Sequence, residues 1–239
     1  MEIEEFSKEL KEELKKKEIT INSEEQEQLF NYMNMVLKRN EVVNLTAITD
    51  PKEFIIKHLV DSATIKKYLE KENKIIDIGT GAGFPGIPLK ILNSNLKMTL
   101  LDSLNKRVDF LNEVIKELRL ENIKAIHLRA EEAGQDDGLR ENFDVATARA
   151  VAPLNILLEY MLPLVKVGGK CICMKGSNIE EEIKESGKAL KILGGEIEKI
   201  ESFTLTDEDN KRNIILIKKV KVTPKKFPRK AGVPKKQPL

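Results

Sequence analysis

Apolar side chains in the first 68 residues recur at helical spacing, and none of this segment alternates like a strand. Leu29, Met33 and Leu37 follow one another every four residues, which places them on one face of a helix. Ser23-Glu24-Glu25-Gln26 has the spacing of a capping box at the start of that helix. We therefore predict helices over residues 2–17, from Ser23 to Asn40, and from Asp50 to about Tyr68, with Pro51 in the first turn of the third.

The pattern changes after residue 68 to short, largely β-branched runs separated by helical segments. Strands that alternate with helices of this length are typical of βαβ units and a mostly parallel sheet. The predicted strands are Lys74–Ile78, Lys97–Leu101, Lys124–Leu128, Phe143–Ala148 and Lys170–Met174. The predicted helices are Gly86–Leu92, Lys106–Arg119, Pro153–Val165 and Ile179–Leu193.

Two last strands, near Glu196–Leu205 and Asn213–Val220, are joined by the polar segment Thr206–Lys211 and should pair antiparallel. The fold class is therefore α/β: a doubly wound, mostly parallel, seven-stranded Rossmann-like sheet with an N-terminal helical extension. We divide the chain into the extension (1–68), the α/β domain (69–220) and a C-terminal tail (221–239).

Composition narrows the class of protein. The 239 residues are 41% hydrophobic and 33% charged, which fits a globular chain of one medium domain with an appendage. No apolar run approaches the roughly 20 residues that span a bilayer, and Met1 is followed by acidic residues rather than a secretory signal. Cys171 and Cys173 lie in a predicted strand without further zinc ligands, so we expect buried thiols, no metal site and a cytoplasmic protein.

The net charge of +2 conceals a basic C-terminus. From Lys218 to Leu239 the chain has eight lysines, Arg229, four prolines and no acidic residue. Such a segment lacks the apolar content to pack alone, and it attracts polyanions such as nucleic acid. The alternative is a solvated tail that only aids solubility. No strongly apolar stripe remains on the surface, which favours a monomer.

A glycine-rich turn follows the first predicted strand, where ligands bind in sheets of this kind. It runs from Asp77 to Gly86, and Gly81, Gly83 and Gly86 satisfy G-x-G-x-x-G, so a nicotinamide or flavin dinucleotide has to be considered. We expect Asp77 to face the ligand, where its carboxylate would repel a pyrophosphate and attract the ammonium and sulfonium of S-adenosylmethionine. The alternative role for Asp77 is that of a cap for the loop.

Asp102 closes the second predicted strand, 19 residues after Gly83. A carboxylate at that place can accept hydrogen bonds from both hydroxyls of a ribose. Both candidate cofactors contain an adenosine, so Asp102 supports an adenosine ligand without separating them.

Several ordered motifs closely resemble the glucose-inhibited division protein B family over about residues 20–239. The resemblance implies a class I methyltransferase fold and transfer of a methyl group from S-adenosylmethionine to N7 of a guanine in bacterial 16S ribosomal RNA, with the RNA or the small ribosomal subunit as partner. The motifs are Asn44–Ala47, His58–Ser62, Asp77–Pro88, Leu101–Arg107, Arg149–Ala152, Lys175-Gly176 and Phe227–Gly232.

The resemblance also implies roles for individual positions. Gly79 and Phe84 would line the cofactor, Asp102 and Ser103 would hold the ribose, and Ala130 with Glu131 would contact the adenine edge. Arg149 would close the pocket or face the RNA. The full cofactor set is Asp77, Gly79, Gly81, Gly83, Phe84, Asp102, Ser103, Ala130, Glu131 and Arg149. The expected RNA contacts are Arg107, Arg149, Lys175, Arg229 and Lys230.

Guanine N7 has a free lone pair and no proton to lose, so the reaction needs alignment rather than a general base. We assign Arg149 and Lys175 a positioning role at the mouth of the site. Thr147–Val151 stands where amine methyltransferases often have Asn/Asp-Pro-Pro-aromatic, which argues against an exocyclic amine substrate. His58, with Asp61 on the same helical face, is expected to position RNA or close the pocket, or else to form a surface pair; His127 is expected to be core or bonded to a partner.

The sequence leaves three other functions open: a dinucleotide-dependent oxidoreductase, a methyltransferase acting on another RNA or on a small molecule, and a non-catalytic ribosome-binding protein.

Overall fold

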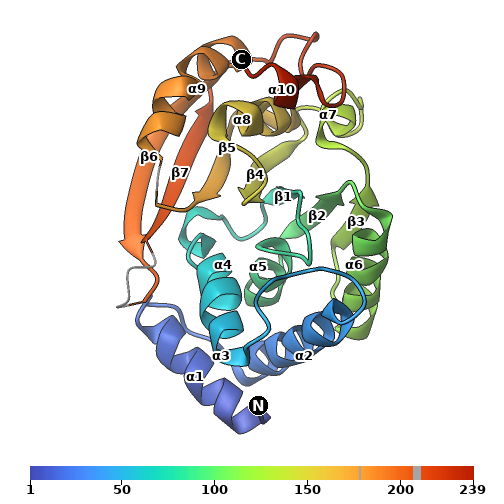
Figure 1. The fold of residues 1–239 in the computed structure, drawn as a ribbon, viewed down its shortest axis with the longest axis vertical. Coiled ribbons are helices and arrows are strands. Elements are labelled where there is room, and N and C mark those ends of the chain that lie inside the picture. Colours follow the sequence, from blue (N-terminus) through green and yellow to red (C-terminus); the bar gives the residue numbers. More distant parts are fainter. Residues whose placement is uncertain (178, 207–210) are drawn as a thin grey trace.

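The computed structural model describes residues 1–177, 179–206 and 211–239, and its centre is one seven-stranded sheet (Figure 1). The strand order is β3-β2-β1-β4-β5-β7-β6, with β7 antiparallel to both of its neighbours and the other pairs parallel. This is the predicted doubly wound α/β sheet. The strands are β1 (Lys74–Ile78), β2 (Lys97–Asp102), β3 (Ile123–His127), β4 (Phe143–Arg149), β5 (Val165–Lys175), β6 (Gly195–Thr204) and β7 (Lys211–Lys219). Part of the predicted 206–211 linker lies outside the described residues.

Helices cover both faces of the sheet. Those of the N-terminal extension are α1 (Ile3–Lys15), α2 (Ser23–Asn40), α3 (Pro51–Phe54), the π-helical segment η1 (Ile55–Val60), α4 (Asp61–Ala63) and the 3-10 turn η2 (Lys66–Tyr68). Those of the sheet region are α5 (Gly86–Leu92), α6 (Asn105–Glu117), α7 (Ala130–Ala133), α8 (Leu154–Met161), η3 (Leu162–Leu164) and α9 (Glu180–Leu193). The short α10 (Val233–Lys236) lies near the C-terminus.

Several boundaries differ from the sequence prediction, most of them by one or two residues. Asn22, not Ser23, caps α2, because its Oδ1 accepts from Glu25 N while the Glu25 carboxylate accepts from Asn22 N. The predicted helix over Pro153–Val165 ends at Met161, since Pro163 has no N–H to continue it and a 3-10 turn follows. Strand β5 begins at Val165, five residues before its predicted start.

Alternating strand residues supply two apolar layers. Ile75 of β1 faces the layer that contains α1, α2, α5 and α6, whereas Ile76 faces the layer that contains α8 and α9. Cys171 and Cys173 are buried in the second layer, which confirms the prediction for both thiols. Burial raises the pKa of each thiol, that of Cys173 to about 12.

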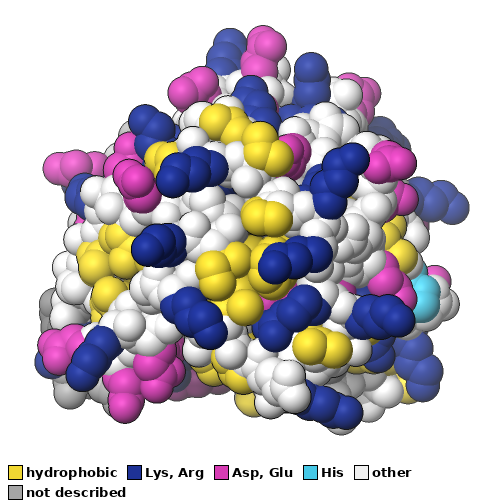
Figure 2. All heavy atoms as spheres, turned by 90° about the horizontal axis from the view of Figure 1, so that it is seen from above, with side chains coloured by type: hydrophobic (Ala, Val, Ile, Leu, Met, Phe, Trp, Pro, Cys, Tyr) yellow, Lys and Arg dark blue, Asp and Glu magenta, His cyan; other side chains and the backbone are white. Residues whose placement is uncertain are grey.

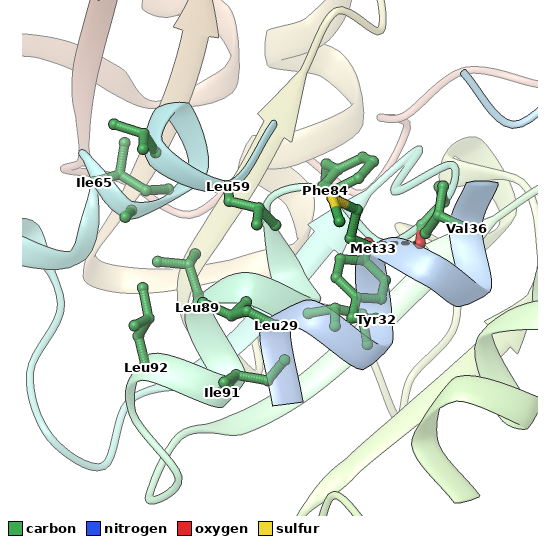
Figure 3. Close-up of a cluster of buried hydrophobic side chains, with 14 of the residues drawn as sticks. Leu29, Tyr32, Met33, Val36, Leu59, Ile65, Phe84, Leu89, Ile91 and Leu92 are labelled. Atoms are coloured by element: carbon green, nitrogen blue, oxygen red, sulfur yellow. Dashed lines mark hydrogen bonds between the residues drawn. The ribbon is translucent and has the colours of Figure 1, made fainter. Parts of the chain in front are cut away.

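The N-terminal helices pack against the sheet in the first layer and contact the glycine loop. Figure 3 shows Leu29 and Tyr32 of α2 beside Leu89 and Ile91 of α5. The Tyr32 hydroxyl donates to the Ala82 carbonyl at 2.8 Å, and its ring meets Phe84 edge-on at 5.5 Å. The extension therefore fixes the loop that the sequence marks as ligand-binding.

The C-terminal segment, residues 221–239, is docked on the body, and we call it the C-terminal strap. The segment does not pack alone but against the body, where Phe227, Pro228 and Pro234 are buried and Thr223 is fully so; the alternative of a wholly solvated tail is wrong. Arg140 fastens it by donating to the carbonyls of Thr223 and Phe227, each at 2.7 Å. The lysine side chains of the strap are exposed to solvent.

In the parts of the chain that the structure describes, no helix is long and apolar enough to cross a membrane.

Candidate functional site

The carboxyl ends of β1, β2 and β4 meet at a small cleft of about 160 Å³, which we call the first cleft. Predicted cofactor residues form a large part of its wall. The lining residues are Ile78, Gly79, Leu101, Asp102, Ser103, Leu128, Arg129, Ala130, Glu131, Val151 and Tyr160. The structure thus brings Gly79, Asp102, Ser103, Ala130 and Glu131 together, as the sequence predicted.

Gly79 begins the glycine loop in a conformation that only glycine adopts without strain. Its φ is +63°, and a Cβ at this position would lie 2.9 Å from a Cγ of Val151. The loop after β4 therefore approaches the glycine loop closely, and Val151 becomes a wall of the cleft between them.

Asp102 lies at the floor of the first cleft with its side chain 2% exposed. Oδ2 accepts from the N–H of Gly81 and Oδ1 from the N–H of Leu104, each at 2.9 Å, and Arg107 Nη1 lies 3.4 Å from Oδ2. These bonds fix the carboxylate in orientation. Oδ1 accepts one hydrogen bond and keeps a second lone pair for a ligand hydroxyl, whereas Oδ2 already accepts from both Gly81 and Arg107.

Asp77 does not face the cleft, so the expectation that its carboxylate meets the ligand is wrong. It is fully buried beneath the glycine loop, where Oδ2 accepts from Thr80 Oγ1 and Gly86 N, and Oδ1 accepts from Thr147 Oγ1. The alternative role, a cap for the loop, is the one observed. Burial raises the pKa of this carboxyl to about 6 against the opposing effect of these three hydrogen bonds.

Glu131 lies on the one-turn helix α7 and is 7% exposed. Its Oε1 accepts from the N–H of Gly232, a residue of the C-terminal strap, at 2.9 Å. Its Oε2 has no hydrogen-bond partner among the described residues. The strap therefore reaches the wall of the first cleft.

A larger cleft of about 640 Å³ lies on the other side of Val151, and we call it the second cleft. It contains four cationic side chains and two carboxylates. The lining residues are Ile48, Lys57, His58, Asp61, Arg149, Ala150, Val151, Ala152, Pro153, Met174, Lys175, Gly176, Glu182 and Arg212. Arg149 and Lys175, predicted to act together, indeed share this cleft.

Arg149 is held by the helical segment that contains His58. Nη1 donates to Asp61 Oδ2 at 2.9 Å and to the Lys57 carbonyl at 3.1 Å, and Nη2 donates to His58 Nδ1 at 3.0 Å. The π-helical winding of η1 presents the Lys57 carbonyl and the His58 and Asp61 side chains to one guanidinium. The guanidinium also lies 4.8 Å from the centre of the Phe84 ring.

His58 is neutral in this arrangement. Burial, and secondly the charge of Arg149, lower the pKa of its imidazole to about 3. Arg149 can only donate, so Nδ1 of His58 accepts from it. Nε2 therefore carries the proton and donates to Thr46 Oγ1, which lies 2.7 Å from Nε2. His58 is therefore fixed by two hydrogen bonds, and one of them orients the guanidinium of Arg149. The exposed His127 bonds to the Ser103 carbonyl at 3.0 Å, the partner-bonded alternative of its prediction.

The two carboxylates of the second cleft are both paired with cations. Lys175 Nζ lies 2.6 Å from Glu182 Oε2 and donates to the Ala152 carbonyl at 2.6 Å. Asp61, which holds Arg149, also has Oδ1 3.3 Å from Arg212 Nε. Both carboxylates are therefore held in ion pairs.

The predicted RNA contacts differ in how far their side chains are exposed to solvent. Lys230 is exposed, and Arg107 is partly exposed at the rim of the first cleft. The Arg229 side chain is 24% exposed and is paired with the buried Glu159, so an RNA contact there stays a prediction. Sequence reasoning missed Arg212 and Val151, because only the strand order reveals that β7 and the loop after β4 border the site.

The fold and the two clefts define a class of protein, the Rossmann-like methyltransferases. A SAM-dependent methyltransferase from Aquifex aeolicus has a similar fold, with a TM-score of 0.54 at 18% identity over 72% of this chain and 94% of the other. So does the TYW2 protein of M. jannaschii in complex with AdoMet, with a TM-score of 0.52 at 17% identity over 66% of this chain and 74% of the other.

Residues 25–215 match the GidB family model, described as rRNA small subunit methyltransferase G. Curated proteins named ribosomal RNA small subunit methyltransferase G are similar along nearly the whole chain. The one from Alkaliphilus metalliredigens is 50% identical over 92% of both chains, and the one from Acetivibrio thermocellus is 52% identical over 92% of this chain and 91% of its own. The chain belongs to this family, which confirms the resemblance seen in the sequence.

Proposed function

We propose that this protein transfers the methyl group of S-adenosylmethionine to N7 of a guanine in 16S ribosomal RNA. The observation that carries the proposal is the family match over residues 25–215, which includes every residue that lines the two clefts. The chemistry of those residues supports it.

The first cleft fits the adenosine part of the cofactor. The buried Asp102 can accept from the ribose hydroxyls, and the unpartnered Oε2 of Glu131 can accept from the amino group of adenine. Gly79 and Gly81 allow close approach at the loop, with Ser103 and Ala130 as further walls. Bound there, S-adenosylmethionine would supply a methyl group activated by a positively charged sulfur.

The second cleft would take the target base. Guanine N7 needs no deprotonation, and the cleft offers none, since Asp61 and Glu182 are both held in ion pairs. Arg149 is rigidly placed between the glycine loop and η1, where it can orient the base against the cofactor. Lys175 lies in the same cleft, where its ammonium can meet a phosphate.

The exposed lysines of the strap would bind the RNA backbone. Figure 2, which views the molecule from the C-terminal side, shows Lys and Arg side chains distributed around exposed apolar groups. Among the strap lysines, Lys221, Lys225, Lys226, Lys230, Lys235 and Lys236 are exposed. We further propose that the protein works as a cytoplasmic monomer, with free RNA or the small subunit as partner.

A dinucleotide fits the loop less well. A pyrophosphate would bind to free N–H groups where the glycine loop enters α5, but Gly86 N–H donates to Asp77 at 3.0 Å. That N–H is therefore not free to bind a phosphate.

The test is methyl transfer from labelled S-adenosylmethionine to small ribosomal subunits from cells that lack this protein, with free 16S RNA and a thermal-shift comparison against NAD alongside. Borohydride and aniline treatment cleaves RNA at N7-methylguanine. We expect label in the RNA and cleavage at one guanine. Label without cleavage would assign another acceptor atom, and stabilisation by NAD alone would overturn the proposal.

A further inference from the structure

The C-terminal strap is anchored beside the first cleft by a buried ion pair. Arg229 Nη2 lies 2.7 Å from Glu159 Oε2, and its Nε donates to Oε1 at 2.9 Å. The main-chain N–H of Arg229 donates to the same Oε1 at 2.8 Å. Glu159 lies on α8 and is 0% exposed, so this arginine fixes both the side chain and the backbone of the strap.

Three residues further on, the strap contacts the cleft wall itself. Gly232 has a φ of +82°, which turns its N–H towards Glu131 Oε1 at 2.9 Å. This bond occupies one oxygen of the carboxylate and leaves Oε2 for a ligand. The orientation of Glu131 is therefore set from outside its own helix.

The strap also holds the segment that follows α7. Gln135 Nε2 donates to the Pro228 carbonyl at 2.8 Å, and Pro228 covers Gly134 so closely that a Cβ there would lie 2.6 Å from its ring. Helix α7 has only four residues, too few to be stable by its own hydrogen bonds. Its geometry depends on what packs against it, and part of that is the strap.

We propose that the C-terminal strap positions Glu131 to recognise the amino group of adenine, with Arg229 and Gly232 as positioning residues. The inference rests on the proposed function, in which the first cleft takes the adenosine of the cofactor. A docked strap presents Glu131 already oriented, so binding of the cofactor does not have to order it. By linkage, a bound cofactor holds the strap in place to the same extent.

The first experiment measures the Kd of S-adenosylhomocysteine and of its analogue with unsubstituted purine in place of adenine. The variants are the Glu159→Gln/Arg229→Gln pair, which removes the ion pair without leaving a buried charge, and a chain truncated after Ala231, which removes Gly232 and its N–H donor. The matched control is Lys230→Ala/Lys235→Ala, which alters exposed strap residues that touch neither Glu131 nor Glu159.

We expect the wild type and the control to prefer S-adenosylhomocysteine about tenfold, as expected for one oriented hydrogen bond to a charged group. Both strap variants should bind it about tenfold more weakly, bind the purine analogue as the wild type does, and so lose the preference. A purely structural role would weaken both ligands alike and would overturn the inference.

The second experiment needs no strap variant. Trypsin cleaves after Lys226 and Lys230, and saturating S-adenosylhomocysteine should slow that cleavage at least fivefold in the wild type but not in Glu131→Ala. Equal cleavage with and without ligand in the wild type would overturn the inference, while measurable binding would leave the proposed function standing. Absence of any binding to the wild type would instead count against the proposed function.

Discussion

Nη2 of Arg149 donates a hydrogen bond to Nδ1 of His58 at 3.0 Å, while the His58 ring stacks on Phe84 at 4.2 Å. The imidazole is thus fixed on one edge by a cation and on one face by the last residue before the cis peptide of the glycine loop. Protonation of His58 would put two cations against each other, so this contact exists only with the neutral ring.

His58 should therefore not titrate near neutral pH. Its pKa is lowered to about 3, so we expect its ring resonances in nitrogen-edited NMR spectra to stay constant between pH 5 and 8. The chain has only two histidines, and His58→Gln identifies the signals unambiguously. Movement of the His58 signals in this range would show that the bond to Arg149 is not maintained in solution.

Replacement of Arg149 by alanine should abolish RNA methylation. The guanidinium joins Asp61, His58 and the Lys57 carbonyl, and its loss misplaces the groups around the target base, for which we expect at least a 100-fold lower kcat/KM. Arg149→Lys should fail nearly as badly, because one ammonium cannot reach all three partners. Methylation assays with circular dichroism as a folding control would decide; an unchanged rate in Arg149→Ala would remove the residue from the site.

Two neighbouring glycines should respond differently to alanine. At Gly83 the φ is +112° and a Cβ would lie 2.5 Å from Ile87, so Gly83→Ala should lower the free energy of unfolding by about 2–4 kcal/mol. At Gly81 a Cβ meets nothing within 4 Å, so Gly81→Ala should cost only about 1 kcal/mol and instead weaken S-adenosylhomocysteine binding. Urea unfolding and calorimetry separate the effects, and equal destabilisation would contradict this account of the loop.

Asp77 should make stability depend on pH in an unusual direction. Its pKa is raised from 3.8 to about 6, so between these values the folded protein binds more protons than the unfolded chain, and the free energy of unfolding falls as pH rises. The difference amounts to about 3 kcal/mol at most. An amide can accept from Thr80 and Gly86 and donate to Thr147, so Asp77→Asn should fold.

The comparison of Asp77→Asn with the wild type removes the opposite contribution of His58, whose lowered pKa makes stability rise with pH between about 3 and 6.5. We expect the variant to gain stability relative to the wild type from pH 4 to pH 6 in urea titrations. A constant difference over that range would mean that Asp77 is not protonated in the folded protein.

The strap lysines should determine the salt dependence of RNA binding. Lys225→Ala/Lys226→Ala/Lys230→Ala removes three exposed charges, and at roughly 0.7 counterions per phosphate contact the slope of log affinity against log salt should fall by about 2. Lysines Lys8, Lys11 and Lys15 of α1 are exposed at the other end of the molecule and provide the control (Figure 1). An unchanged slope would exclude the strap as a phosphate contact.

Periodicity sufficed for the sheet because each βαβ unit is encoded locally. The runs around Ile75 and Met98 are flanked by turns and amphipathic helices, so the strand positions followed from chain order, apart from the early start of β5. Gly79, Asp102 and Glu131 lie near one another because each is at or just after the carboxyl end of a parallel strand; their roles toward the cofactor rest on the family resemblance and stay predictions.

The errors arose where a contact joins distant segments. Asp77 accepts from Thr80 and Gly86 of its own loop, but its third donor, Thr147, comes 70 residues later on β4, and no local pattern shows that strand covering it. Basic surroundings predict Arg229 as an RNA contact, and they do not reveal its partner Glu159, which is likewise 70 residues away. The sequence shows the charge of a side chain, but only the fold shows whether that side chain has an ion-pair partner.

The order in which the chain is made gives the docked strap another consequence. Glu131 precedes by 101 residues the glycine whose N–H binds it, so this contact can form only after residue 232 has been made. A chain cut after residue 229 retains every residue of the seven strands and of the cleft lining, yet it loses the N–H that binds Glu131. Proteolysis within the strap would thus change the surroundings of Glu131 without removing any part of the sheet.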